Sequence, residues 1–103
     1  MATKMRRSSG NVFRDLGYGA EDAEHLRIRS VLMAALTRLI EERELTQTEA
    51  ARVFGVTQPR VSDLVRGKID LFSIDMLVDM LARAGMQIQL SAKPTSKRRP
   101  RVA

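Results

Sequence analysis

The stretch LTQTEAARVFGVTQPRVSDLVRGK, residues 45–68, carries the strongest structural signal in the chain. Near its start, Thr46 and Glu49 match a capping box, in which each side chain satisfies a backbone N–H of the first helical turn. This pattern predicts a helix over residues 47–54. Glycine readily takes the left-handed conformation that follows a helix end, so we expect this helix to stop at Gly55.

A further short helix is predicted directly after this turn. Thr57 is placed as its N-cap, Pro59 lies in the first turn, where a missing N–H costs nothing, and Gly67 follows the last turn. The small side chain of Ala51 lets the two helices approach closely. Apolar contacts inside the angle would come from Ala50, Phe54, Val56, Val61 and Leu64. Together, the small residue, the glycine turn and the apolar positions match the pattern of a DNA-binding helix-turn-helix. The alternative is a purely structural helical hairpin.

Helices are also predicted on both sides of this pair. An amphipathic stripe with helical spacing places a long helix at about residues 21–44, and Ser73 and Gly85 delimit a later one as N-cap and stop. The stripe consists of Leu32, Ala35, Leu36, Leu39 and Ile40. The fold class expected is therefore all-α, a bundle of four to five helices.

The residues after Gly85 change period. Met86, Ile88 and Leu90 alternate with polar residues, which predicts one short C-terminal strand within residues 86–92. A lone strand exposes unpaired N–H and C=O groups on both edges. We therefore favour a strand that pairs between two copies of the chain, with a tail segment as the alternative, and expect a homodimer.

Charge is distributed unevenly along the chain. Its 103 residues contain 18 Lys and Arg against 12 Asp and Glu. Residues 1–10 and 93–103 carry eight of the cations and no anion, so residues 11–92 hold ten cations against twelve anions. Both ends are small, polar or like-charged, and we expect two disordered tails around one domain, residues 11–92. Net charge is therefore weak support for DNA binding by that domain, and individual cations must carry the argument.

Composition excludes several protein classes. The chain has no cysteine and one histidine, His25, and shows no nucleophile triad, carboxylate-pair motif, glycine-rich phosphate loop or metal-spaced cluster. We expect no enzyme activity, no catalytic or metal site and no cofactor. The longest apolar run, residues 31–36, is far shorter than the roughly 20 residues that a membrane helix needs. No apolar stretch of a signal peptide follows the basic N-terminus, so a soluble cytoplasmic protein without membrane contact is expected.

The predicted helix after Thr57 offers polar side chains for reading DNA. Gln58 and Arg60 lie in its first turn, and Ser62 and Asp63 in the next. In the major groove a glutamine pairs with adenine and an arginine with guanine, each contact being worth roughly 1 to 3 kcal/mol of discrimination. Arg60 lies near a helix N-terminus, where the dipole disfavours a cation. Without a visible compensation this favours a functional role, the alternative being a solvated surface arginine.

Phosphate contacts are expected from residues that flank this helix. Gln47 begins the preceding helix, where backbone N–H groups can meet a phosphate, and Arg66 and Lys68 surround Gly67. A solvated surface is the alternative for both cations. The full set of expected DNA-binding residues is Gln47, Thr57, Gln58, Pro59, Arg60, Ser62, Asp63, Arg66 and Lys68.

Residues 45–77 resemble the helix-turn-helix domain of the xenobiotic-response-element (XRE) repressor family, with the motif LTQ…GV…QPRVSDL…GK. With NVFRDLG at residues 11–17 and GMQIQL at residues 85–90, the chain is similar to HigA-type antitoxins of bacterial toxin–antitoxin pairs. The resemblance implies a lambda-repressor-like fold and a homodimer that binds double-stranded operator DNA, represses its own operon and neutralises a RelE-like toxin. Such relatives would touch DNA through Gln47 and the outward residues after Thr57.

The antitoxin interpretation assigns toxin contact to the N-terminal part of the domain. Acidic residues would suit a basic RNA-cleaving toxin, and apolar residues would anchor it. The candidates are Phe13, Leu16, Glu21, Asp22 and Glu24. The alternative is that they cap and cover the domain's own core. Two other functions remain open: a stand-alone XRE-type repressor without a toxin partner, and an RNA-binding accessory protein that uses its basic tails.

Overall fold

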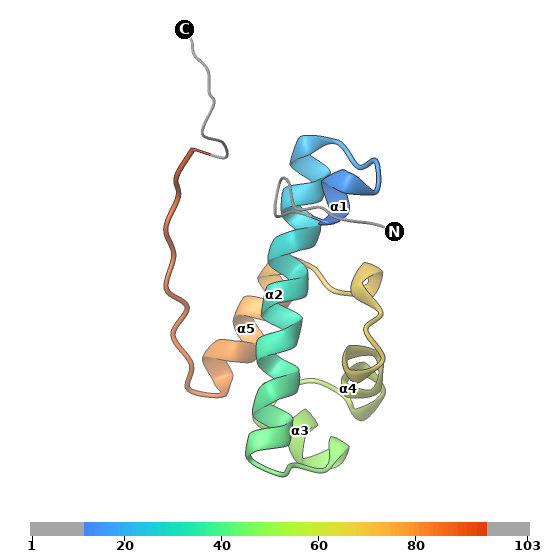
Figure 1. Ribbon diagram of the computed structural model, residues 1–103. Helices are drawn as coiled ribbons and strands as arrows, with labels where there is room; N and C mark the ends of the chain where they lie inside the picture. The colour runs from blue at the N-terminus through green and yellow to red at the C-terminus, as the bar shows by residue number, and fades with distance from the viewer. Residues whose placement is uncertain (1–11, 95–103) are drawn as a thin grey trace, which may run out of the picture.

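The computed structural model describes residues 12–94 and consists of helices packed around one long central helix (Figure 1). That helix is α2, with α5 on one side of it and α4 with the short η2 turn on the other, while α3 lies near its C-terminal end. In chain order the elements are α1 (Val12–Asp15), α2 (Ala20–Glu42), α3 (Gln47–Phe54), α4 (Gln58–Val65), the 3-10 turn η2 (Ile69–Leu71) and α5 (Ile74–Arg83). The predicted all-α class is therefore correct.

One apolar core joins these helices. Leu36 of α2, Val61 of α4 and Leu77 of α5 are each fully buried, at 0% exposure. Phe54 and Phe72 are the largest side chains enclosed with them. Burying each such side chain stabilises the fold by roughly 1.5 to 3 kcal/mol, so α2 and α5 hold the short α3–α4 pair in place although neither short helix would be stable alone.

The predicted helix starts are confirmed by their hydrogen bonds. The backbone N–H of Glu49 donates to Thr46 Oγ1 at 3.1 Å, and the N–H of Thr46 donates to Glu49 Oε1 at 2.9 Å, which completes the capping box. Thr57 caps α4 and Ser73 caps α5 by the same kind of bond to the third residue of each helix. Local sequence therefore determines where α3, α4 and α5 begin.

The prediction of a short C-terminal strand is wrong, since no residue between 12 and 94 forms a strand. Residues 86–94 run away from α5 without a β ladder (Figure 1). Of the alternating apolar residues only Ile88 packs against the core, whereas Met86 is 42% and Leu90 is 89% exposed. A strand needs a second segment to receive its N–H and C=O groups, and the described part of the chain supplies none.

Two elements were not predicted, the short α1 and the η2 turn between α4 and α5. Of the tails expected at residues 1–10 and 93–103, all but residues 93 and 94 lie outside the described residues. Within residues 12–94, no helix combines the length and the apolar character required to cross a bilayer.

Candidate nucleic-acid interface

The turn between α3 and α4 sets the geometry of the candidate interface. Gly55 ends α3 with φ of 73°, a left-handed conformation that glycine adopts without the Cβ clash of other residues. The N–H of Val56 then donates to the carbonyl of Ala51 at 3.0 Å, which closes the turn. Inside the angle, Ala51 and Val61 are 8% and 0% exposed. The small residues predicted for this angle do meet there, and α4 is held against α3 with its polar side outward.

The outward side of α4 contains most of the residues predicted to read DNA. Thr57, Gln58 and Pro59 are exposed at its start, while Ser62 and Asp63 are half-buried in the next turn. Within the described residues no side-chain partner holds the amide of Gln58. Its donor and acceptor groups are therefore available to a base edge.

Arg60 differs from its neighbours because other parts of the chain hold it. Its Nη1 donates to the backbone carbonyl of Leu71 at 3.1 Å, and its guanidinium carbon lies 5.5 Å from the centre of the Phe72 ring. The side chain is half-buried. From the sequence, nothing was expected to compensate the charge of Arg60 in the first turn of α4, and this expectation is wrong. The Leu71 carbonyl and the face of the Phe72 ring both compensate it.

The residues predicted to contact phosphate lie on both sides of this reading surface. Gln47 occupies the first position of α3, directly after the capping residue, and is half-buried. Arg66 and Lys68 flank Gly67 at the other end of α4 and are exposed. Neither cation's side chain is paired with another described residue. Two exposed cations at one end of α4 and a helix N-terminus at the start of α3 would suit a phosphate backbone on each side of a groove.

Three features of this surface were not predicted from the sequence. Phe72 and the Leu71 carbonyl hold Arg60, and the end of the Arg83 side chain lies over Gly55. Val65 leaves 41% of its surface exposed at the end of α4. The first two contacts join residues far apart in the sequence, so no local spacing could reveal them. The outward position of Val65 follows from the helical period and could have been found.

The residues predicted to bind a toxin lie at α1 and the start of α2. Leu16 is 70% exposed, Glu21 and Asp22 are exposed, and the ring of half-buried Phe13 meets Tyr18 edge to face, with centroids 6.2 Å apart. The structure therefore brings these apolar and acidic residues to one end of the molecule.

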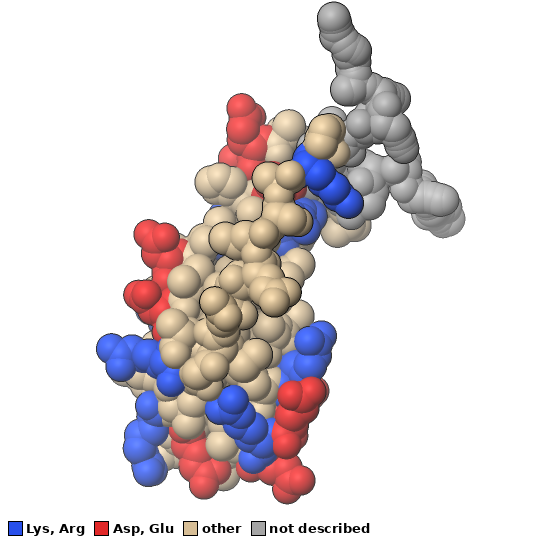
Figure 2. Space-filling view, turned by 90° about the vertical axis from the view of Figure 1, so that its left-hand side faces the viewer, with Lys and Arg blue, Asp and Glu red and all other residues tan. Residues whose placement is uncertain are grey.

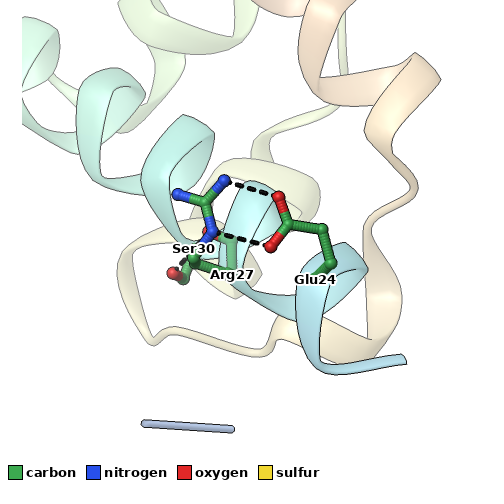
Figure 3. Close-up of polar contacts among 3 residues, drawn as sticks. All are labelled: Glu24, Arg27 and Ser30. Carbon is green, nitrogen blue, oxygen red and sulfur yellow. Dashed lines mark hydrogen bonds and ion pairs between the residues drawn. The ribbon is translucent and has the colours of Figure 1, made fainter. Parts of the chain in front are cut away.

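Glu24, the remaining predicted toxin contact, is already paired within α2. Its carboxylate accepts two hydrogen bonds from Arg27, at 3.0 and 2.7 Å (Figure 3). These bonds lower the pKa of the Glu24 carboxyl from its ordinary value of 4.5. Of the three acidic candidates, Glu24 is thus the one whose charge is partly neutralised before any partner arrives. Among residues 12–94, no group of three or more His, Cys, Asp or Glu side chains could hold a metal ion.

Comparisons with known proteins agree with this geometry. The model of a helix-turn-helix domain family matches residues 12–93. A solved structure whose description assigns it to the XRE family of transcriptional regulators is 31% identical, with a TM-score of 0.67, and the match covers 80% of this chain and 94% of that one. A comparison with curated proteins finds no match.

The fold and the exposed side of α4 thus define a protein of the helix-turn-helix class. The chain belongs to the helix-turn-helix domain family whose model spans residues 12–93, and it is similar over most of its length to an XRE-type regulator. Together these findings support a DNA-binding transcriptional regulator. Regulators of this class generally have no enzymatic activity.

Proposed function

We propose that the protein is a sequence-specific repressor that inserts α4 into the major groove of double-stranded operator DNA. The observation that carries this proposal is the polar outward side of α4, which begins with the unpartnered Gln58 and continues through Arg60, Ser62 and Asp63. Thr57 and Pro59 shape the start of the helix beside the DNA. A glutamine and an arginine on one helical turn can discriminate adenine and guanine at neighbouring base pairs.

The same proposal assigns the sequence-independent contacts. Gln47 would offer its amide and the N-terminal N–H groups of α3 to one phosphate, and Arg66 and Lys68 would bind the backbone beyond the other end of α4. These contacts fix the register of α4 in the groove. Because they involve phosphates only, their loss would weaken binding to all sequences alike.

The experiment that tests this function compares the protein's own promoter with single base-pair variants of it. Gln58→Ala should reduce the discrimination between promoter and variants at particular base pairs, whereas Arg66→Ala should lower both affinities equally. Equal binding of the unaltered protein to promoter and unrelated duplex DNA would refute a sequence-specific repressor. Binding that instead depends only on residues 93–103 would support the alternative of an RNA-binding accessory protein.

We further propose that two copies bind a two-fold operator. A homodimer would present its α4 helices to half-sites about one DNA turn, roughly 34 Å, apart. Supporting this, an uncharged band runs along the face formed by α5 and the segment after it, with most charges at its sides (Figure 2). Exposed apolar residues on these elements are Val78, Met86 and Leu90. Such a patch on a small domain is typical of a protein–protein contact.

Leu90→Asp tests the dimer by sedimentation. Since Leu90 is 89% exposed, the substitution leaves the folded protomer unaffected but would place a carboxylate in a dimer interface. Gln89→Asp is the matched control at the neighbouring exposed position. A mass that stays dimeric for Leu90→Asp would show that this face is not the interface.

The finer proposal is that the repressor is an antitoxin for a RelE-like toxin. It rests on the resemblance to HigA-type antitoxins and on exposed acidic and apolar residues at one end of the molecule. The toxin-binding set proposed is Phe13, Leu16, Glu21, Asp22 and Glu24. A basic RNA-cleaving partner would be attracted by the carboxylates and anchored by the apolar side chains.

A gene neighbouring this one provides the test. If its product is a small basic protein that is toxic when expressed alone, coexpression with this protein should restore growth. A double variant, Leu16→Ala with Glu21→Lys, should abolish that rescue while operator binding persists. If no such toxic product exists beside the gene, the chain is a stand-alone XRE-type repressor, and the DNA-binding proposal is unaffected.

A further inference from the structure

Phe72 lies at the junction of η2 and α5, behind the reading surface rather than on it. Its side chain is only 2% exposed, yet its ring lies under the guanidinium of Arg60, 5.5 Å from ring centre to guanidinium carbon. The residue before it, Leu71, accepts a hydrogen bond from Arg60 Nη1 at 3.1 Å. One buried ring and one carbonyl thus hold a residue on α4 from a different part of the chain.

We propose that Phe72 is a positioning residue that determines how strictly α4 discriminates bases, by holding Arg60 in one orientation before DNA arrives. This inference rests on the proposed function, because it assigns the origin of the selectivity of the same reading helix. Phe72 itself touches no base, since it is buried in the core.

The geometry of a guanidinium makes this arrangement effective. An arginine has five N–H donors in one plane, and a cation–π contact with a ring uses none of them. The Leu71 carbonyl takes one N–H, so other in-plane donors stay available for a guanine edge. A free arginine side chain loses much rotamer freedom when it is fixed on DNA. Here the protein has restricted Arg60 beforehand, and the loss on binding is smaller.

The support behind Arg60 is itself rigid. Phe72 belongs to the same buried core cluster as Leu77 and Phe54. The next residue, Ser73, caps α5 by accepting from the N–H of Met76 at 3.1 Å. The ring therefore cannot turn away without disturbing both the core and the start of α5. Because the ring is fixed, it can hold the Arg60 guanidinium in one orientation, whereas a mobile ring would only attract its charge.

The test compares two Phe→Leu variants in the full chain. Phe72→Leu removes the aromatic face and keeps an apolar side chain in place. Phe54→Leu makes the same change at a 1% exposed position of the same core, where the ring does not lie under Arg60. Affinities for the promoter and for its single base-pair variants are measured by fluorescence anisotropy, at a temperature where circular dichroism shows each variant folded. We expect Phe72→Leu to reduce discrimination about 2- to 30-fold at one base pair, and Phe54→Leu to leave it unchanged.

Arg60→Lys identifies the base pair concerned. It keeps the charge but loses the planar fork, so it should reduce discrimination at the same base pair, and combining it with Phe72→Leu should add little further. In the free protein, the NMR signal of the Arg60 Nε–H should move on Phe72→Leu, because the ring current disappears. This measurement keeps the inference testable even if Phe72→Leu weakens folding.

The following outcomes would overturn the inference. If Phe72→Leu discriminates as well as the unaltered protein while Arg60→Lys discriminates less, Arg60 reads DNA without support from Phe72. An equal loss in Phe54→Leu would mean that any loosening of the core has the same effect. No change in Arg60→Lys would show that Arg60 reads no base. If the unaltered protein discriminates no base pair at all, the proposed function itself fails, which this design separates from the three results above.

Discussion

Replacing Gly55 by alanine tests whether the left-handed turn between α3 and α4 is a requirement of the fold. Gly67, after α4, provides a matched control, because both glycines have φ of 73°. Their surroundings differ. A Cβ at Gly67 would meet nothing within 4 Å, whereas a Cβ at Gly55 would lie 2.6 Å from Cδ and 2.7 Å from Nε of Arg83. The two substitutions share a backbone cost and differ in a steric one.

The backbone cost follows from the conformation. A left-handed conformation costs an L-residue about 1 to 2 kcal/mol, and alanine returns about 0.4 to 1 kcal/mol by restricting the unfolded chain. The net loss expected at Gly67 is therefore about 1 kcal/mol of unfolding free energy. At Gly55 the clash involves the far end of an exposed, flexible side chain, which can move aside. We therefore expect the loss of unfolding free energy to be larger for Gly55→Ala than for Gly67→Ala, by less than about 1 kcal/mol. A side-chain rearrangement ordinarily costs about this much.

Urea unfolding followed by circular dichroism measures both losses, and the combination of Gly55→Ala with Arg83→Ala should remove the difference between them. A neutral Gly55→Ala would refute the reasoning, because it would mean that the turn does not require a positive φ. A difference that persists without the Arg83 side chain would show that the clash lies in the backbone. The affinity for operator DNA should fall little if the new methyl group displaces only Arg83.

Three further predictions concern the caps, the ion pair and the salt dependence. Thr46→Ala removes the capping box and should lower the unfolding free energy by about 1 kcal/mol. Thr48 is exposed on the same turn, and Thr48→Ala should change the unfolding free energy by less than about 0.5 kcal/mol. Equal losses for the two variants would contradict a specific cap. Glu24 has a lowered pKa when folded, so its pairing with Arg27 stabilises the protein above pH 4.5 and this contribution is lost as the pH falls through the lowered pKa. Because the pair is exposed, Glu24→Gln should change the melting temperature slightly at pH 7 and not at pH 2. A difference in melting temperature between the variant and the unaltered protein that is larger at pH 2 than at pH 7 would contradict the pairing. Arg66→Ala should make the slope of log K against log salt shallower by about 0.9 per protomer, and an unchanged slope would exclude a phosphate contact.

The features that could be predicted from the sequence are those that depend on neighbours within a helical turn. The capping box of Thr46 and Glu49, the caps at Thr57 and Ser73, and the turn at Gly55 all follow from residues a few positions apart. These local rules determine where each short helix begins and ends. The apolar positions between them then determine which sides face inward, so the outward side of α4 was foreseen as well.

The features that were missed depend on segments that only the fold brings together. Phe72 reaches Arg60 because η2 returns the chain to α4, and Arg83 reaches Gly55 because α5 packs beside α3. The alternating residues after Gly85 predicted a strand, but alternation shows only that a segment could pair and not that a partner is present. Within residues 12–94 no partner segment lies beside it.

The charge balance of the folded domain constrains how it can bind a polyanion. Residues 11–92 hold more anions than cations, so the domain has no overall attraction to phosphate, and affinity must come from where single cations lie. Arg60 is partly engaged by its own chain, which leaves the exposed Arg66 and Lys68 as the free charges beside the end of α4. Counterion release by two cations per protomer would give a shallow salt dependence. A steep dependence would instead implicate the eight cations of residues 1–10 and 93–103, whose contacts to phosphate would add affinity for any base sequence. The salt dependence therefore separates sequence-independent binding to phosphates from the reading of bases. Discrimination between base pairs should persist at salt concentrations that remove most of the phosphate binding.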